Sequence, residues 1–508
     1  MSAIDVLRQI KLARRAAGAQ KVVEWGNADY INDVGIDNLN RRELKNHLEA
    51  RDLETGGTRL ELIERLRNSL NDEQMNKFAY AETIDTEFLI QADLEQRGSV
   101  YVIGSNEKGQ LGVGDTEARK QFTCIKELRG INIGFVVAGS DLCFAINDEH
   151  DVYVWGGGGV GKTGINFKKT PVEVMIEEAA AKKLAGANKN KTANKEKHAK
   201  VIDPVAAAKA NWMEPQIVKD FAGEEIISIT IGSSHCLAVG KGGDCFVWGD
   251  GDVGQLGLGN FDNSSTISIN NSFPGVKLVS AGANHSAVLV GCNQQVFLWG
   301  HAGNGRLGIG SWERIGVPER EKAFYPIPTP LLTLEAIRLL SCGADHTLAY
   351  GMSGVWSWGS GSGGKLGLGD EKDRLSPCLV PRLKGKSVTC IVASVWYSMA
   401  IACHPPLIDA GWIYSWGSGY HGQLAQGPKQ ISLLPETADY FITYHLFVKA
   451  IFCGSHHCAA ITKEGELYTW GSNKNGCLGR KIEANGTEYT SIPGHVGGFG
   501  ALVDKVIT

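Results

Sequence analysis

The stretch "WGDGDVGQLG", Trp248 to Gly257, decides the fold, because closely related ten-residue phrases recur along the 508-residue chain. Their form is W-G-x-x-x-x-G-[Q/K/R]-L-G, and the copies begin at residues 103, 155, 248, 299, 358, 416 and 470. All but one of the intervals between these starts measure 51 to 59 residues, and the exception, from 155 to 248, measures 93 residues. Self-similarity at a fixed period of this length is typical of proteins built from repeated structural units.

A second phrase lies ahead of the first in each interval. Its copies read "AGSDLCFAI", "IGSSHCLAV", "AGANHSAVL", "CGADHTLAY", "ASVWYSMAI" and "CGSHHCAAI". A β-branched run precedes each copy, and an apolar run, a turn and alternating apolar residues follow it, which predicts four short strands per unit with no helix between them. One such small sheet cannot bury both of its faces, so the units are expected to stack radially into a β-propeller.

The chain ends explain why there are seven copies of the first phrase and six of the second. The final "GALVDKVIT" predicts an innermost strand, and "TEFLIQADLEQRGSVYVIG" from Thr86 predicts a second strand, a turn and a third strand. Pairing these segments would join the two ends of the ring and remove the free strand edges of an open array. We therefore predict an all-β fold, a seven-bladed propeller over residues 84–508, closed by residues 502–508.

The repeated residues have structural explanations that need no ligand. The Trp side chain is expected to pack between blades, the glycines to allow positive φ and close backbone approach, and the Leu to anchor the turn. The histidines of the second phrase are predicted to hydrogen-bond neighbouring backbone rather than to catalyse a reaction: His235, His285, His346 and His457. The string "CGSHHC", Cys453 to Cys458, resembles a metal-binding cluster, but alternate strand residues point to opposite faces, so we predict no metal site.

The copy "WGGGGVGKTG", Trp155 to Gly164, also matches the G-x-x-x-x-G-K-T pattern of a nucleotide-binding P-loop. A working P-loop needs a strand, this loop and then a helix whose N-terminus faces the phosphates. Here "INFKKTPVEV" follows, with Pro171 and no helical onset. Aligned on the other copies, Lys162 takes the place of Gln, Lys or Arg and Thr163 replaces Leu, so we interpret the stretch as a propeller turn that binds no nucleotide.

Both phrases, their order and their period resemble the regulator of chromosome condensation repeat family, whose members form seven-bladed propellers. The best-known member of that family promotes nucleotide exchange on the small GTPase Ran while bound to chromatin, using one propeller face and a projecting β-hairpin. The resemblance implies a protein partner on a propeller face. The largest insertion here is Lys-rich and helical in pattern rather than a short hairpin, so exchange activity is one alternative and not the first.

Ahead of the propeller we expect an N-terminal helical segment (residues 1–35), a helical hairpin (36–71) and a linker (72–83). The first segment carries five basic residues by Lys21, and a surface helix is favoured over a cleaved transit peptide. The hairpin resembles a SAP motif, which implies nucleic-acid binding through phosphate contacts, made by Arg41, Arg42, Lys45, Arg59 and Arg65. Residues 36–70 contain seven basic and seven acidic residues, so a protein-docking or purely packing hairpin stays an alternative.

The one long interval predicts an insertion at residues 165–212, with Ala-rich pieces around a Lys-rich centre. A flexible surface loop is the first interpretation, and a basic arm for nucleic acid or a nuclear import signal is the alternative. The chain as a whole has 51 basic and 55 acidic residues, which implies no global attraction to nucleic acid or membranes. The 12 cysteines include no C-x-x-C pair and favour reduced thiols, and no apolar run of 18 residues occurs.

These observations predict a non-catalytic, monomeric, nuclear adaptor without cofactor or metal. The SAP-like hairpin would contact DNA or RNA, and the propeller would bind a protein. A guanine-nucleotide exchange factor for a Ran-like GTPase and a structural scaffold in a cytoskeletal or organellar assembly are the alternatives. The alternative to a nuclear location is a cytoplasmic, cytoskeletal or organellar one. No nucleophile elbow, paired catalytic carboxylates or metal-ligand spacing indicates an enzyme.

Overall fold

The chain divides by its contacts into two units, residues 1–89 and residues 90–508. The computed structural model describes residues 99–157, 161–164, 212–273, 275–291, 294–310, 322–334, 336–403, 409–482 and 488–497. All of them belong to the second unit. The predicted SAP-like hairpin, the Lys-rich insertion up to residue 211 and the closing strand at residues 502–508 lie outside the described residues.

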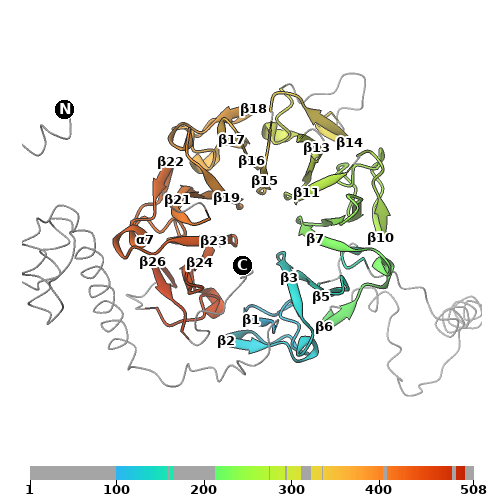
Figure 1. Cartoon of the computed structure of the whole chain (residues 1–508), viewed down its shortest axis with the longest axis horizontal. Helices are drawn as coiled ribbons and strands as arrows, with labels where there is room; N and C mark the ends of the chain where they lie inside the picture. Colours follow the sequence, from blue (N-terminus) through green and yellow to red (C-terminus); the bar gives the residue numbers. More distant parts are fainter. Residues whose placement is uncertain are drawn as a thin grey trace, which may run out of the picture. The chain divides into compact units, whose positions relative to one another are not determined.

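The described residues form a ring of small antiparallel sheets around a central axis (Figure 1). Six sheets or sheet segments have four strands, and consecutive strands run from the axis outward. The first three consist of β3 (Ile133–Ala138), β4 (Leu142–Asn147), β5 (Val152–Gly156) and β6 (Trp212–Ile217); β7 (Ile226–Ile231), β8 (His235–Gly240), β9 (Cys245–Gly249) and β10 (Ser264–Ile269); and β11 (Val276–Ala281), β12 (His285–Val290), β13 (Gln295–His301) and β14 (Phe324–Leu331).

The other three units complete the described part of the ring. They consist of β15 (Leu339–Cys342), β16 (His346–Gly351), β17 (Gly354–Gly359) and β18 (Arg374–Leu379); β19 (Val388–Ala393), β20 (Tyr397–Cys403), β21 (Gly411–Ser418) and β22 (Ile431–Thr437); and β23 (Val448–Cys453), β24 (His457–Thr462), β25 (Leu467–Ser472) and β26 (Tyr489–His495). A single pairing, Gly411 with Val448, links β21 to β23 and formally joins the last two units.

A two-stranded sheet lies between the last and the first of these units (Figure 1). It pairs β1 (Tyr101–Gly104) with β2 (Arg119–Cys124). The predicted third strand of the closing blade is therefore confirmed as β1. The two inner strands predicted for this blade fall on residues 86–98 and 502–508, which are not described, so seven complete blades and closure by the C-terminus stay predictions.

The hydrophobic core lies between neighbouring sheets rather than within one of them. The second and third strands are almost wholly buried, and all six residues of β8 and of β12 are buried. The repeat tryptophans are fully buried, and Trp248 packs edge-on against Phe144 of the preceding unit at a ring distance of 5.8 Å. Side chains shared between adjacent sheets make each unit depend on its neighbours, which confirms the predicted role of the tryptophan.

Two glycines of the first phrase show why no other residue fits there. Gly249 ends β9 with φ of +105°, and a Cβ would lie 2.6 Å from the carbonyl oxygen of Ser234. Gly257 has φ of +69°, and a Cβ would lie 2.7 Å from Nε1 of Trp299 in the next unit. The repeated glycines therefore let one turn close onto its own sheet and onto the next one.

Short helical segments join the units, at links for which the strand prediction makes no statement. Three are 3-10 turns and the fourth is a five-residue helix, and each buries one apolar side chain under the end of a sheet: η3 (Lys126–Leu128), η6 (Lys219–Phe221), η10 (Pro381–Leu383) and α7 (Asp439–Thr443). Strand periodicity predicts nothing about such short links, because a single helical turn has too few residues to show a period. No described helix is long and apolar enough to cross a membrane.

Candidate interaction site

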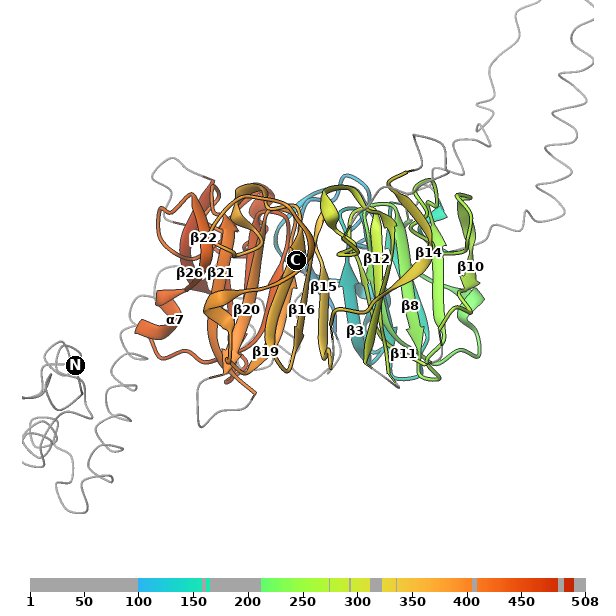
Figure 2. The same ribbon diagram turned by 90° about the horizontal axis from the view of Figure 1, so that it is seen from above.

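Both repeated phrases lie on one face of the ring, which we call the turn face. It carries the turn between the first and second strands of each unit and the turn between the third and fourth strands. Because the strands are antiparallel, these two turns meet at the same end of the sheet. Figure 2 shows the ring from its side, with the strands running between the turn face and the opposite face.

A hydrogen-bond relay joins consecutive units just beneath the turn face. The carbonyl oxygen of the eighth residue in the first phrase accepts a bond from the tryptophan indole of the next unit, at 2.7–3.0 Å. The pairs are Trp155 with Gln110, Trp248 with Lys162, Trp299 with Gln255, Trp358 with Arg306, Trp416 with Lys365 and Trp470 with Gln423. The sequence predicts the burial of these tryptophans but not this bond.

The same carbonyl accepts a second bond from the residue that follows the histidine position in the next unit. The donors are hydroxyl or thiol groups: Cys143, Cys236, Ser286, Thr347, Ser398 and Cys458. A carbonyl oxygen has two lone pairs, so each one can serve both donors. Ser, Thr or Cys stands at this position in all six copies of the second phrase, and this recurrence is the sequence signal that would have revealed the relay.

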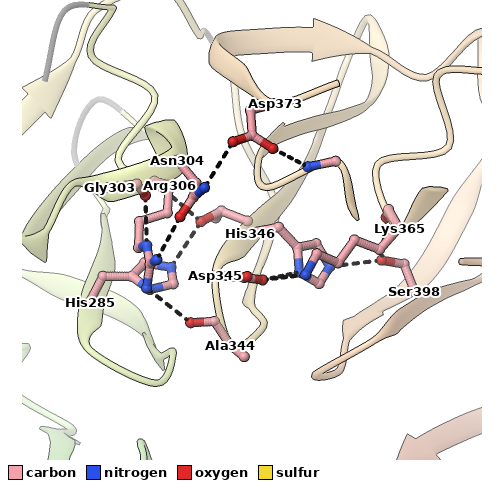
Figure 3. Close-up of polar contacts among 12 residues, drawn as sticks. His285, Gly303, Asn304, Arg306, Ala344, Asp345, His346, Lys365, Asp373 and Ser398 are labelled. Carbon is pink, nitrogen blue, oxygen red and sulfur yellow. Dashed lines mark hydrogen bonds and ion pairs between the residues drawn. The ribbon is translucent and has the colours of Figure 1, made fainter. Parts of the chain in front are cut away.

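Three of the four histidines donate to these hydroxyls rather than to backbone, which corrects the prediction from sequence. Nε2 of His346 lies 2.9 Å from Oγ of Ser398, whose single proton is given to the carbonyl of Lys365 (Figure 3). The imidazole therefore donates from Nε2. Burial lowers the pKa of His346 to about 3 and that of His235 to about 4, so both rings are neutral near neutral pH. His235 and His285 bond in the same way to Ser286 and Thr347.

The lysines at the eighth position of the first phrase are buried, and each forms an ion pair with an Asp of its own unit. Nζ of Lys365 lies 2.5 Å from a carboxylate oxygen of Asp345, and Nζ of Lys162 lies 2.7 Å from one of Asp141 (Figure 3 draws the first pair). Asp stands before the histidine position in the two units that have Lys at the eighth position. Lys162 also donates to the carbonyl of Ser233. Its ammonium therefore points into the ring, as expected for a propeller turn and not for a phosphate-binding loop.

Arg306 takes the same place in the third unit, where Asn284 stands instead of Asp. Its guanidinium donates to the carbonyl of Gly303 at 2.9 Å, to that of Ala344 at 3.4 Å and to the side chain of Asn304 at 3.3 Å (Figure 3). Asn304 in turn donates to Asp373 of the next unit. These side chains are occupied in joining neighbouring units, so the relay is structural.

Trp396 departs from this pattern and is the first member of an exposed aromatic patch. It stands before the histidine position, where other units have Asp, Ser, Asn or His, and its exposed fraction is 46%. Its carbonyl accepts a bond from the amide of Ser418, which places it beside the turn that carries Tyr420, 52% exposed. On its inner side, Nζ of Lys365 lies 5.7 Å from the ring centre.

The patch continues onto the last unit. The ring centre of His421 lies 4.6 Å from that of His456 and 6.2 Å from that of Tyr489, which is 40% exposed. We call Trp396, Tyr420, His421, His456 and Tyr489 the aromatic patch. Exposed clusters of Trp and Tyr are typical of protein-binding surfaces, because such rings bury a large area for little entropy cost.

A central channel of about 1760 Å³ passes between the innermost strands. About half of its lining comes from the glycine-rich turns of the second phrase, such as Gly232, Gly282 and Gly343. Among the described residues no group of three or more His, Cys, Asp or Glu side chains could hold a metal ion. Burial raises the pKa of Cys143 and of Cys342, both on the channel, to about 12, so neither is a reactive thiolate near neutral pH.

The nucleic-acid contacts predicted from sequence cannot be compared with this geometry. Arg41, Arg42, Lys45, Arg59 and Arg65 all lie outside the described residues. The aromatic patch is what sequence reasoning missed. Trp396 is conspicuous in "ASVWYSMAI" because it replaces small or polar residues, but its exposure and its neighbours depend on two turns from different units.

The fold and its repeated inter-unit relay define a β-propeller assembled from one recurring sheet. The chain belongs to the RCC1-like domain family, whose model matches residues 89–400. Models of the regulator of chromosome condensation (RCC1) repeat match residues 410–461 and 464–507. The resemblance inferred from the two phrases is therefore confirmed for the propeller; these matches do not include the SAP-like hairpin.

Known proteins similar to this chain share the propeller. The ultraviolet-B receptor UVR8 of Arabidopsis thaliana is 31% identical over 261 residues, 51% of this chain and 56% of that protein. The E3 ubiquitin-protein ligase HERC2 of Homo sapiens is 26% identical over 397 residues, 72% of this chain but 8% of the ligase. The chain therefore spans little more than half of one relative and a small part of the other.

Solved structures agree on the fold. The crystal structure of Prp20p from Saccharomyces cerevisiae, described with its binding properties to Gsp1p and histones, has a TM-score of 0.60 at 18% identity and covers 81% of this chain and 90% of its own. The human WBSCR16 structure has a TM-score of 0.57 at 20% identity and covers 78% of this chain and 93% of its own. At such identities the likeness establishes the architecture alone.

Proposed function

We propose that this protein is a non-catalytic adaptor whose propeller binds a protein partner through the aromatic patch. The observation that carries the proposal is the exposure of Trp396, Tyr420 and Tyr489 on one sector of the turn face. None of the three is needed for the relay, which uses the buried tryptophans and the hydroxyls beneath them. A large exposed aromatic side chain that the relay does not use is best explained by a binding partner that covers it.

The test compares the full chain with Trp396→Ala and Tyr420→Ala in pull-downs quantified by mass spectrometry. Asn284→Ala is the matched control, because Asn284 occupies the position of Trp396 in the third unit. A partner of the patch should be retained by the wild type and the control and lost from both patch variants, since hot-spot residues contribute about 2 kcal/mol or more, roughly 30-fold in affinity. Equal recovery from all four proteins would reject the patch as the binding surface.

The SAP-like hairpin is proposed as the second binding element, for DNA or RNA. Its support is the motif and the basic residues Arg41, Arg42 and Arg59. Replacing these three should abolish salt-dependent binding of a DNA or RNA duplex while leaving the partner of the propeller bound. Absence of any binding by the wild type at low salt would remove this part of the proposal, and with it the reason for a nuclear location.

A guanine-nucleotide exchange factor is the second candidate, favoured by the likeness to Prp20p, whose structure is described with its binding to Gsp1p. An exchange factor acts by binding and distorting a GTPase, so it needs no catalytic side chains of its own. Release of labelled GDP from a Ran-like GTPase, measured with and without the full chain, separates this candidate from the adaptor. A scaffold role would be indicated by a stable assembly without exchange or nucleic-acid binding.

A further inference from the structure

Two histidines from different units face each other within the aromatic patch and are separate from the relay. His421 belongs to the turn after β21, and His456 belongs to the turn between β23 and β24. Their ring centres are 4.6 Å apart, and the ring planes lie at 74°. Neither ring makes a hydrogen bond to any described residue, in contrast to His235, His285 and His346. Both rings therefore have nitrogens available to a ligand.

The backbone on each side of this histidine pair is well fixed. The amide of His421 donates to the side chain of Gln423 at 2.8 Å, and the amide of Gly422 donates to the carbonyl of Gly419 at 2.8 Å. The carbonyl of His456 accepts from the amide of Ser472 at 2.9 Å. The turn that carries His421 also packs on the outer strand of the next unit, because a Cβ on Gly422 would lie 2.6 Å from the carbonyl of Thr490 in β26. The separation of the imidazoles is thus set by the ring of sheets.

We propose that His421 and His456 form a two-histidine site for a late divalent transition metal, with Cu²⁺ the preferred ion and Ni²⁺ the next. The geometry supports this choice of metal. With a metal–nitrogen bond of about 2.0–2.1 Å, each ring centre lies roughly 3.2 Å from the ion. Nitrogens at a right angle then place the ring centres roughly 4.5 Å apart, and a tetrahedral angle places them roughly 5.2 Å apart.

The observed separation of 4.6 Å matches the right angle of a square-planar or tetragonal site, which Cu²⁺ and Ni²⁺ prefer. Rotation about χ2, which is broad for histidine, can turn the nitrogens toward a common point. Two protein ligands leave further coordination positions to water or to a side chain of a bound partner. Cu²⁺ also binds nitrogen ligands more tightly than the other first-row divalent ions do.

The site would join the last two units of the described ring across their boundary. It does not depend on the proposed function, because metal binding needs no partner and no nucleic acid. It also differs from the zinc cluster that "CGSHHC" suggested, since that string holds one histidine of the pair and His421 is 35 residues away in sequence. The proposal therefore departs from the prediction of no metal, which considered that string without His421.

The test titrates Cu²⁺ and Ni²⁺ into the full chain, measured by calorimetry and, for Cu²⁺, by electron paramagnetic resonance. The variants are His421→Asn and His456→Asn, which keep the side-chain volume close to native. His301→Ala is the matched control, because His301 begins the corresponding turn of the third unit and its Nδ1 accepts the amide of Gly303. Circular dichroism of the metal-free proteins establishes that each variant is folded.

We expect the wild type and His301→Ala to bind one Cu²⁺ more than either pair variant, or to bind it at least about tenfold more tightly, because the second imidazole acts at high effective concentration. The resonance spectrum should show two nitrogen ligands in the wild type and one after either substitution. Saturating Cu²⁺ should also raise the melting temperature of the wild type more than that of the variants. Equal affinity and stoichiometry in the wild type and both pair variants would overturn the proposal, as would an equal loss in His301→Ala.

Discussion

The relay beneath the turn face predicts that one hydroxyl group, Ser398, measurably stabilises the propeller. Oγ of Ser398 donates to the carbonyl of Lys365 and accepts from Nε2 of His346, both at 2.9 Å. Ser398→Ala removes both bonds. The carbonyl keeps the indole bond of Trp416, but the buried imidazole loses its acceptor. Leaving such a donor without a partner costs about 1–3 kcal/mol, so the free energy of unfolding should fall by that amount.

The repeat itself supplies the matched control, since Thr347 fills the same position in the preceding unit. Ser398→Thr keeps the hydroxyl and should cost less than about 1 kcal/mol. Unfolding in urea, followed by tryptophan fluorescence, measures both variants. A cost for Ser398→Ala below about 0.5 kcal/mol, or an equal cost for the two variants, would refute the reasoning, because surface-like substitutions already reach that value.

A double-mutant cycle isolates the contribution of the imidazole. His346→Leu imitates the first unit, where Leu142 stands at the histidine position. In that background Ser398→Ala no longer leaves a buried ring N–H without an acceptor. The cost of Ser398→Ala should therefore shrink by about 1 kcal/mol or more relative to its cost in the wild type. Additive costs in the two backgrounds would mean that the bond to His346 contributes nothing.

Three further outcomes are expected. Burial lowers the pKa of His235 to about 4 and that of His346 to about 3, from the ordinary value of 6.5. Between pH 6.5 and these values the unfolded chain binds more protons than the folded one, so the free energy of unfolding should be full above pH 6.5 and fall as the pH drops toward 4. A constant urea midpoint between pH 7 and 5 would contradict this expectation. Lys162→Gln should fold normally and Lys162→Ala should be destabilised, because Gln occupies this position in three units and keeps part of the polar contact. Tight binding of ATP by the wild type that is lost in Lys162→Ala would restore the P-loop interpretation. Removing residues 502–508 should lower the melting temperature sharply if they close the ring, and an unchanged value would reject that closure.

The strands and their grouping are readable from sequence because the pattern is local and repeated. In "HCLAVG", residues 235–240, and in "CFVWG", residues 245–249, the apolar residues form short runs bounded by glycines and turns, as expected for buried strands. Gly249 and Gly257 mark turns because only glycine accepts their backbone angles without strain. One copy of the phrase is weak evidence for a strand and a turn, but seven copies at a regular period identify the propeller.

The aromatic patch and the histidine pair were not predictable in this way. His421 and His456 have no common motif, and 35 residues that include two strands and the helix α7 separate them. Their proximity follows from the packing of one unit's turn on the next unit's outer strand. The sequence also predicts that a histidine in the second phrase makes a hydrogen bond, but the partner atom depends on the neighbouring sheet. The acceptor of His346 lies 52 residues further along the chain.

The sequence by itself therefore determined the repeating unit, its four strands, its turns and the class of fold, since these depend on periodicity and on backbone conformations that single residues dictate. Only the tertiary structure decided that the eighth-position carbonyl joins neighbouring units, that Lys162 points inward, and that Trp396 lies exposed beside Tyr420. These features depend on distances between side chains of different sheets. Radial packing fixes such distances, and no local pattern encodes them.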